Sequence, residues 1–82
     1  MTRYNKSVFD FSELLGLIIA KYGSRAAFAK AMGMKETVLS GRLLNKTNFT
    51  PDEILQACEL LGIPLTDIHR FFYTLKFHFS EL

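Results

Sequence analysis

The sequence predicts a small, mainly α-helical domain of five helices with a short β-strand near its C-terminal end. Three observations predict this fold class. Apolar residues recur at helical spacing over most of the chain, helix-capping patterns precede several of these stretches, and apolar and polar residues alternate only near the end. The chain has 82 residues, of which 49% are hydrophobic and 22% are charged. This length and composition predict one folded domain spanning residues 1–82.

The first helix is expected to begin after Asp10. Asp10 and Glu13 have the spacing of a capping box, in which each side chain accepts a hydrogen bond from a backbone N–H group at the start of the helix. Apolar residues then recur at positions 11, 14, 15, 18, 19 and 22, which is the spacing of one helix face. Gly23 is a suitable residue to end this helix.

Two short helices follow, and a tight turn at Gly33 joins them. Ser24 is expected to cap the first of them, because its hydroxyl can accept a hydrogen bond from the first turn. Gly33 can adopt the left-handed backbone conformation that ends a helix. The second helix is expected to start near Lys35 and to end before Asn45, which tolerates that conformation better than most residues. Residues 24–46 therefore predict a helix-turn-helix unit, whose second helix suits the DNA major groove.

A fourth helix is expected to begin at Pro51. Thr50 precedes it as the capping residue, and Glu53 completes a capping box. Gly62 is expected to end this helix, and Pro64 to open a short fifth one. The buried side of the fourth helix is predicted to consist of Ile54, Leu55, Ala57, Cys58 and Leu61.

The C-terminal stretch changes to the spacing of a β-strand. Residues 73–79 alternate between apolar and polar, and the apolar ones are Tyr73, Leu75, Phe77 and Phe79. A terminal aromatic strand has an apolar face and an unpaired edge, so we expect it to pair with its own copy and form the interface of a homodimer. Two alternatives stay open. The segment Tyr4–Val8 can supply the partner strand, or the aromatic rings can fold back over the core of the monomer.

Charge is distributed unevenly along the chain. Residues 1–46 carry eight basic and three acidic residues, a net charge of +5, whereas residues 47–82 carry two basic and five acidic residues, a net charge of −3. The first half therefore favours a polyanionic partner such as DNA, although an ordinary solvated surface can have the same composition.

Other classes of function are disfavoured. The single Cys58 cannot form an intrachain disulfide, and no Cys/His cluster predicts a metal site or a cofactor. No arrangement of nucleophile and base, or of paired carboxylates, predicts an enzyme, so no small-molecule substrate is expected. The longest apolar runs have seven residues or fewer, against the ~20 that a membrane-spanning helix needs, and no signal-peptide pattern is present. We therefore expect a cytoplasmic protein without catalytic activity.

The helix-turn-helix segment resembles a known family. The helix-turn-helix core of the Cro/CI-type phage repressors is similar to this chain at Ala29, Gly33, Met34, Leu39 and Ser40. The following stretch, from Leu43 to Ile54, is similar to that of one group of small phage repressor-like proteins. The resemblance implies a five-helix, lambda-repressor-like domain that binds double-stranded operator DNA, commonly as a dimer.

The resemblance also implies which residues contact DNA. The start and exposed side of the second helix of the unit face the bases, through Lys35, Glu36, Thr37, Ser40 and Gly41. The phosphates are contacted by Ser24, Arg25, Arg42, Lys46, Thr47 and Asn48. Arg42 stands where the family usually has an apolar residue, and Leu43 supplies the buried contact instead. Arg42 is therefore expected to be free for a phosphate.

These expectations together predict a sequence-specific DNA-binding transcriptional regulator, a Cro-like repressor of a phage or prophage. Repression would follow from occupation of promoter DNA. The alternative is a protein-interaction module, such as an antirepressor or a partner of a repressor or antitoxin, that uses the aromatic C-terminal strand as its interface.

Overall fold

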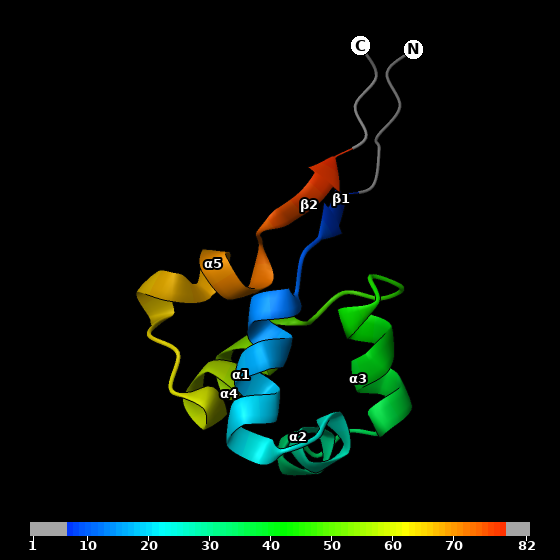
Figure 1. The fold of residues 1–82 in the computed structure, drawn as a ribbon, viewed down its shortest axis with the longest axis vertical. Helices are drawn as coiled ribbons and strands as arrows, with labels where there is room; N and C mark the ends of the chain where they lie inside the picture. The colour runs from blue at the N-terminus through cyan, green and yellow to red at the C-terminus, as the bar shows by residue number, and fades with distance from the viewer. Residues whose placement is uncertain (1–6, 79–82) are drawn as a thin grey trace.

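The computed structural model describes residues 7–78 of the chain (Figure 1). These residues form, in order, β1 (Ser7–Phe9), α1 (Ser12–Tyr22), α2 (Arg25–Met32), α3 (Glu36–Leu43), α4 (Pro51–Leu61), the 3₁₀ helix η1 (Leu65–Asp67), α5 (Ile68–Phe72) and β2 (Leu75–His78). The predicted fold class, mainly helical with five helices and a strand near the C-terminal end, is confirmed. Within the described part of the chain, no helix is long and apolar enough to cross a membrane.

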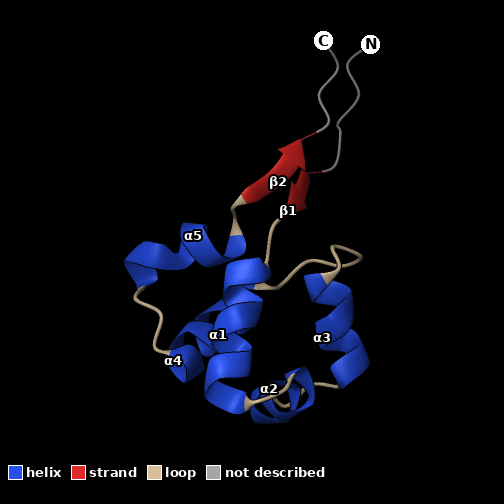
Figure 2. Cartoon of the chain, viewed as in Figure 1, coloured by secondary structure: helices blue, strands red, loops and turns tan. Residues whose placement is uncertain are grey.

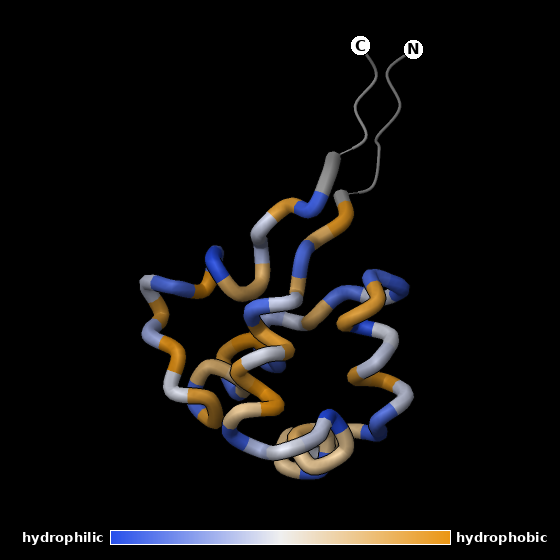
Figure 3. The backbone as a smooth tube through the Cα atoms, viewed as in Figure 1, coloured by the Kyte–Doolittle hydropathy of each residue, from blue (hydrophilic) through white to orange (hydrophobic). Residues whose placement is uncertain are grey.

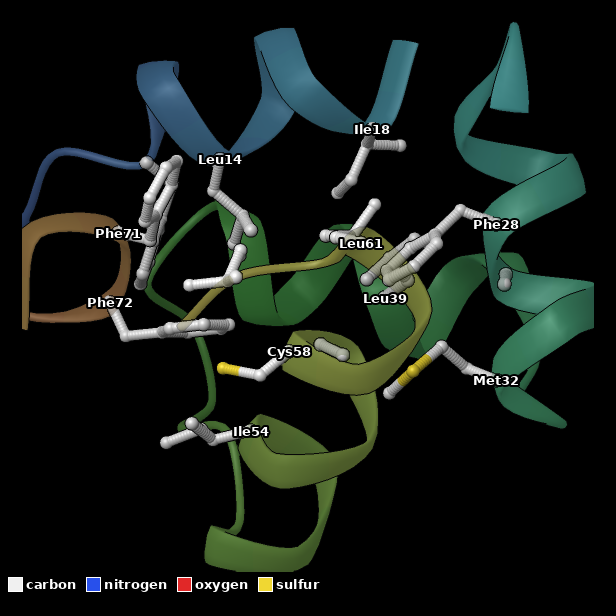
Figure 4. Packing of buried hydrophobic residues seen from close by; sticks show 14 residues of the cluster. Leu14, Ile18, Phe28, Met32, Leu39, Ile54, Cys58, Leu61, Phe71 and Phe72 are labelled. Atoms are coloured by element: carbon white, nitrogen blue, oxygen red, sulfur yellow. The ribbon is translucent and has the colours of Figure 1, made fainter. Parts of the chain in front are cut away.

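A cluster of buried side chains holds the described helices together (Figure 4). Helices α1, α2, α4 and α5 each contribute at least two of these side chains, whereas α3 contributes Leu39. Removing one large apolar side chain from water stabilises the fold by about 1.5–3 kcal/mol, so this cluster is the main source of stability. It consists of Phe11, Leu14, Ile18, Phe28, Ala29, Met32, Leu39, Ile54, Ala57, Cys58, Leu61, Ile63, Phe71 and Phe72.

The local signals at the ends of α2 and α4 act as predicted. The Ala27 N–H group donates a hydrogen bond to the Ser24 hydroxyl oxygen (3.1 Å) at the start of α2. Helix α2 ends at Gly33, which has a left-handed φ of 73°. At the start of α4, Thr50 and Glu53 form both hydrogen bonds of the capping box. These predictions are confirmed. They could be made from the sequence because each depends only on residues a few positions apart.

The predicted capping box at the start of α1 is wrong. The hydroxyl and the backbone N–H group (2.9 Å) of Ser12 donate hydrogen bonds to Asp10, which lowers the pKa of the Asp10 carboxyl, and α1 begins only at Ser12. The guanidinium of Arg70, on α5, donates to the Glu13 carboxylate. The Asp10 N–H group, which the capping box would pair with Glu13, donates instead to the Thr74 carbonyl (2.7 Å), so the box does not form.

Two residues that were expected inside the core are exposed. Ile19 on α1 has an exposed fraction of 44%, and Leu55 on α4 has one of 50%. The buried side of α1 is instead centred on Leu14 and Ile18. Both helices are covered on one side, so the buried stripe is narrower than the apolar spacing of the sequence predicts.

The two strands form an antiparallel sheet at the end of the molecule opposite α2 (Figures 1 and 2). Val8 lies opposite Phe77, and a shift in register after Val8 places Phe9 opposite Leu75. The strand predicted at 73–79 is therefore observed at 75–78. Its partner within the chain is the N-terminal strand, which is one of the two alternatives that the sequence left open.

The residues expected at a dimer interface have different positions in this sheet. Tyr73 precedes β2, and its ring contacts the ring of Phe9 edge-on with 5.6 Å between the centroids. Leu75 lies in β2, and both Tyr73 and Leu75 are about half exposed. Phe77 is paired in the sheet through its backbone, and Phe79 lies outside the described residues. Pairing between two copies of the chain stays a prediction.

Candidate nucleic-acid interface

Helices α2 and α3 are joined by a tight turn whose backbone hydrogen bonds fix their relative direction. The Gly33 N–H group donates to the Lys30 carbonyl (3.0 Å), and the Met34 N–H group donates to the Ala29 carbonyl (2.9 Å). Ala29 is buried, and its small side chain lets the two helices approach each other closely. Leu39 fixes α3 to the core with an exposed fraction of 0%. This is the geometry of a helix-turn-helix unit, with α3 at the edge of the molecule (Figure 1).

Four of the residues expected to contact bases lie at the start and along the outer part of α3. Lys35, Glu36 and Thr37 are exposed, and Ser40 is partly buried. Lys35 is the residue before the helix, and its side chain makes no capping hydrogen bond. Residues 36, 37 and 40 lie on one face of a helix, because side chains three or four positions apart are neighbours. Glu36, Thr37 and Ser40, together with Lys35 just before the helix, form one polar surface, here called the α3 surface.

Gly41 is four positions after Thr37 on α3 but adds no side chain to the α3 surface. Its carbonyl accepts hydrogen bonds from the N–H groups of Lys46 (2.9 Å) and Thr47 (3.3 Å), so the loop after α3 folds back over this residue. A Cβ atom added at Gly41 would lie 3.4 Å from the Thr47 hydroxyl oxygen. A Cβ atom at this distance would make an ordinary van der Waals contact, so the loop does not require glycine here. A base contact at Gly41 stays a prediction.

Arg42 is not free as expected, because Glu53 and Thr47 bind its guanidinium, and a phosphate contact at Arg42 stays a prediction. Its guanidinium donates two hydrogen bonds to the Glu53 carboxylate, from Nε (2.8 Å) and from Nη2 (3.0 Å). A third, from Nη1, goes to the Thr47 hydroxyl oxygen (2.8 Å). The two charged side chains are only 16% and 19% exposed. A bidentate pair of this kind is stronger than a single hydrogen bond, so Arg42 joins the end of α3 to the start of α4.

The same pair changes the titration of both groups. The hydrogen bonds from Arg42 lower the pKa of the Glu53 carboxyl, and the Thr50 N–H group adds to this effect. The hydrogen bonds to Glu53 raise the pKa of the Arg42 guanidinium. The two charges offset each other, and the other cations in α2, α3 and the described segments that flank them are Arg25, Lys30, Lys35 and Lys46.

The other residues expected to contact phosphates lie on two exposed segments. Ser24 and Arg25 are at the start of α2, where the N–H groups of the first turn favour an anion. The Ser24 hydroxyl oxygen is an acceptor in the helix cap, but a hydroxyl also has one hydrogen to donate. Lys46, Thr47 and Asn48 are exposed in the hydrophilic loop after α3 (Figure 3).

The sequence did not reveal the role of the Asn45 side chain. Its Nδ2 atom donates a hydrogen bond to the Phe9 carbonyl (3.0 Å), and the Phe9 N–H group donates to its Oδ1 atom (2.9 Å). Asn45 has a left-handed φ of 63°, as predicted for a residue that ends a helix. The sequence contained one signal for this role. Glycine is the usual residue with this backbone conformation at the end of a helix, and an asparagine in its place adds a side chain that can bind another segment.

A groove of about 330 Å³ lies between the sheet, the start of α1 and the end of α3. Most of its lining is apolar, and Asp10 and Lys76 are its charged members. Leu44, which is 60% exposed, is also part of the lining. The remaining lining residues are Val8, Phe9, Phe11, Ser12, Leu15, Leu43 and Asn45.

Other kinds of chemistry have little support in the described residues. Between residues 7 and 78, no three His, Cys, Asp or Glu side chains are grouped so that they could hold a metal ion. Cys58 is buried, and desolvation raises the pKa of its thiol, which makes the reactive thiolate scarcer.

The chain is similar to a phage regulator of known structure. It matches the solution structure of the modulator of repression (MOR) of the temperate bacteriophage TP901-1 from Lactococcus lactis with 40% sequence identity and a TM-score of 0.72. The match covers 79% of this chain and 88% of that chain. A comparison with curated proteins finds no match. The chain is therefore homologous to a regulatory phage protein.

A family model described as "Protein of unknown function (DUF739)" matches residues 7–75. This range includes the helix-turn-helix unit and all five described helices. Because the matching model is not one of the Cro/CI-type repressors, membership of that family stays a prediction. The chain belongs to the DUF739 family of proteins of unknown function.

Proposed function

We propose that this protein modulates repression in a temperate phage and that it acts through the exposed side of its helix-turn-helix unit. The observation that carries the first part is the 40% identity with a protein described as a modulator of repression. The geometry of α2, the turn and α3 supports the second part. We expect the protein to work in the host cytoplasm as a single regulatory domain, and occupation of a promoter needs neither catalysis nor a cofactor.

Double-stranded operator DNA is the first candidate ligand. Lys35 can donate to guanine acceptors, Glu36 can accept from the amino group of cytosine, and Thr37 can contact the methyl group of thymine. Ser40 adds a hydroxyl on the same surface. Lysine and threonine at the exposed start of a helix that projects from a rigid unit support insertion into the major groove.

Phosphate contacts would come from both sides of this helix. The start of α2 offers its backbone N–H groups together with Ser24 and Arg25, and the loop after α3 offers Lys46 and the neighbouring hydroxyl and amide groups. Arg42 is left out of this set, because Glu53 holds its guanidinium. Thr47 and Asn48 stay in it as exposed donors.

We also propose that two copies associate through β2. This strand pairs with β1 along one edge, and within the described two-stranded sheet its other edge has no partner strand. Tyr73, just before β2, and Leu75, within it, are about half exposed. Antiparallel pairing of two β2 strands across a two-fold axis would place two α3 helices on one side of DNA.

Fluorescence anisotropy tests the DNA function. The labelled duplex is the intergenic DNA beside the gene, and a scrambled duplex is the control over a salt series. We expect specific binding tighter by a factor of about 10³ or more, with an affinity that falls as salt rises. The double variant Lys35→Ala, Thr37→Ala should lose this preference. Arg70→Ala removes a positive charge from α5, on the other side of the molecule, and should keep it (Figure 1).

A repressor protein is the second candidate ligand, and the apolar groove favours it. The groove and the exposed Leu44 lie at the end of α3, where a protein side chain could bury apolar area that DNA does not offer. Leu44→Gln, which removes the apolar side chain without adding a charge, should weaken binding to a purified repressor of the same phage and leave duplex binding unchanged. Equal, weak binding of the wild type to both duplexes, with tight binding to the repressor, would favour this second function over the first.

A further inference from the structure

Helix α3 has few packing contacts for an element that has to present side chains in a fixed direction. Leu39 is its one fully buried residue, and it points into the core near Phe28 and Leu61 (Figure 4). Leu43 within the helix and Met34 before it are only partly buried. The turn holds the start of α3 and Leu39 holds its middle, so contacts at its other end are needed to restrict the remaining tilt and rotation.

Two side-chain contacts at the end of α3 supply this restraint. The first joins the Asn45 amide to the backbone of Phe9, with hydrogen bonds of 2.9 and 3.0 Å in opposite directions. The second joins the Arg42 guanidinium to Glu53, with hydrogen bonds of 2.8 and 3.0 Å.

The Asn45 contact imitates the pairing of a β-strand. A primary amide has one donor and one acceptor side by side, and here they meet the N–H group and the carbonyl of a single residue, as a neighbouring strand would. This happens at Phe9, where the register of the sheet shifts after Val8. The end of α3 is thereby attached to β1, which is 36 positions earlier in the chain.

The Arg42 contact acts in a second direction. Glu53 is in the first turn of α4, and its carboxylate also accepts a hydrogen bond from the Thr50 N–H group (3.0 Å). The capping box therefore helps to hold the carboxylate that Arg42 binds. Attachments to β1 and to α4 lie in different elements, so together they restrict both the tilt and the rotation of α3.

We propose that Asn45 and Arg42 are positioning residues, which set the orientation of α3 and thus the direction of the α3 surface. They would act without touching the ligand themselves. This inference rests on the proposed function in so far as the α3 surface binds a ligand, but the orientation of α3 can be measured on the protein alone.

Asn45→Gly is the main test variant. Glycine accepts a φ of 63° more readily than asparagine, so the change removes the hydrogen bonds to Phe9 without adding backbone strain. Asn45→Asp is the second variant. It keeps an acceptor for the Phe9 N–H group but turns a carboxylate toward the Phe9 carbonyl, so one of the two hydrogen bonds is lost. Asn48→Gly, in the same loop, controls for general loop flexibility in the experiments on the free protein.

The first readout is structural and needs no ligand. In Asn45→Gly the Phe9 amide proton should exchange about tenfold faster than in the wild type, whereas the Ile54 amide proton in α4 should not change. Residual dipolar couplings of α3 should no longer fit the orientation of the other helices. Asn48→Gly should change neither result. Unchanged protection of Phe9 together with unchanged couplings of α3 would overturn the proposal.

The second readout is binding, and it separates positioning from direct contact. Duplex affinity of Asn45→Gly should fall about five- to tenfold with the same slope of affinity against salt, because no phosphate contact is lost. A change in thermal stability alone, with the same affinity at a temperature where both proteins are folded, would reduce Asn45 to a structural role and contradict the proposal. If the wild type binds no duplex, the proposed DNA function fails, and the dipolar couplings still decide the role of Asn45.

Discussion

At the scale of single residues, the ion pair between Arg42 and Glu53 joins two parts of the molecule and changes which groups can meet a ligand. The sequence places a basic side chain in the second helix of the helix-turn-helix unit, and nothing within a few positions of Arg42 reveals the carboxylate that binds it. Glu53 is 11 positions away, and its local signal is that of a capping residue. The capping role and the ion pair coexist because a carboxylate has two oxygens that can accept several hydrogen bonds.

This pair predicts how stability depends on pH. The pKa of Glu53 in the folded protein lies below its ordinary value of 4.5, because Arg42 donates to the ionised form. The stabilisation is therefore fully present above pH 4.5 and is lost as the pH falls through the lower, folded-state value. Urea denaturation of the wild type from neutral pH to about pH 3 should show this loss of unfolding free energy.

Glu53→Gln is the matched variant for this measurement. Glutamine can still complete the capping box but cannot ionise, so the unfolding free energy of the variant should depend less steeply on pH in the acid range. Asp10, whose pKa is also lowered, titrates in both proteins and cancels in the comparison. The same acid dependence in both proteins would contradict the assignment to Glu53.

At the scale of elements, glycine has opposite effects at two positions of the chain. Gly33 has a φ of 73°, and an added Cβ atom would meet nothing within 4 Å, so strain in the backbone is the whole cost of a side chain there. Gly16 lies in the middle of α1, and an added Cβ atom there also meets nothing within 4 Å. The two positions therefore separate backbone conformation from packing.

Alanine at these positions should change stability in opposite directions. Gly33→Ala should lower the free energy of unfolding by about 1 kcal/mol, because alanine pays for the left-handed conformation. Gly16→Ala should raise it by up to about 1 kcal/mol, because alanine is the better helix former and restricts the unfolded chain. Chemical denaturation of both variants checks this, and a stabilised Gly33→Ala protein would show that the turn is not under this constraint.

The elements that could be predicted from the sequence are those fixed by near neighbours. The cap at Ser24, the capping box at Thr50 and the left-handed residues that end α2 and α4 all depend on spacings of a few residues. The capping box at Asp10 failed because both of its groups have other partners: its carboxylate accepts from Ser12, and its N–H group donates to the Thr74 carbonyl (2.7 Å). Local spacing shows what a side chain can bind, whereas the fold decides which partner it meets.

At the scale of the whole molecule, the sequence predicted the fold class, including two short helices joined by a turn at Gly33. It could not choose the partner of the C-terminal strand, because the alternation in residues 73–79 fits pairing with the N-terminal segment and pairing with a second copy equally well. The chain folds with β1 against β2, which occupies one edge of β2. The fold also reduces the uneven distribution of charge. Arg42 belongs to the basic half of the sequence and Glu53 to the acidic half, and their charges offset each other in an ion pair.

The proposed dimer makes a prediction at this scale. Leu75→Lys places a charge on a half-exposed position of β2 that needs no buried space in the monomer. The wild type should sediment as a dimer at micromolar concentration, and the variant should sediment as a folded monomer with weaker duplex binding. Glu59→Lys, an exposed change on α4, should leave the dimer intact. A monomeric wild type would exclude association through β2.

The central claim is that the α3 surface meets the ligand, and chemical-shift mapping of the ¹⁵N-labelled protein tests it most directly. The duplex from the intergenic region is added stepwise, and each backbone amide is followed. We predict that the largest changes occur at residues 35–37 and 40, at the start of α2, and in the loop of residues 46–48. Largest changes in β2 or α5, with the amides of α3 unchanged at saturation, would contradict the account.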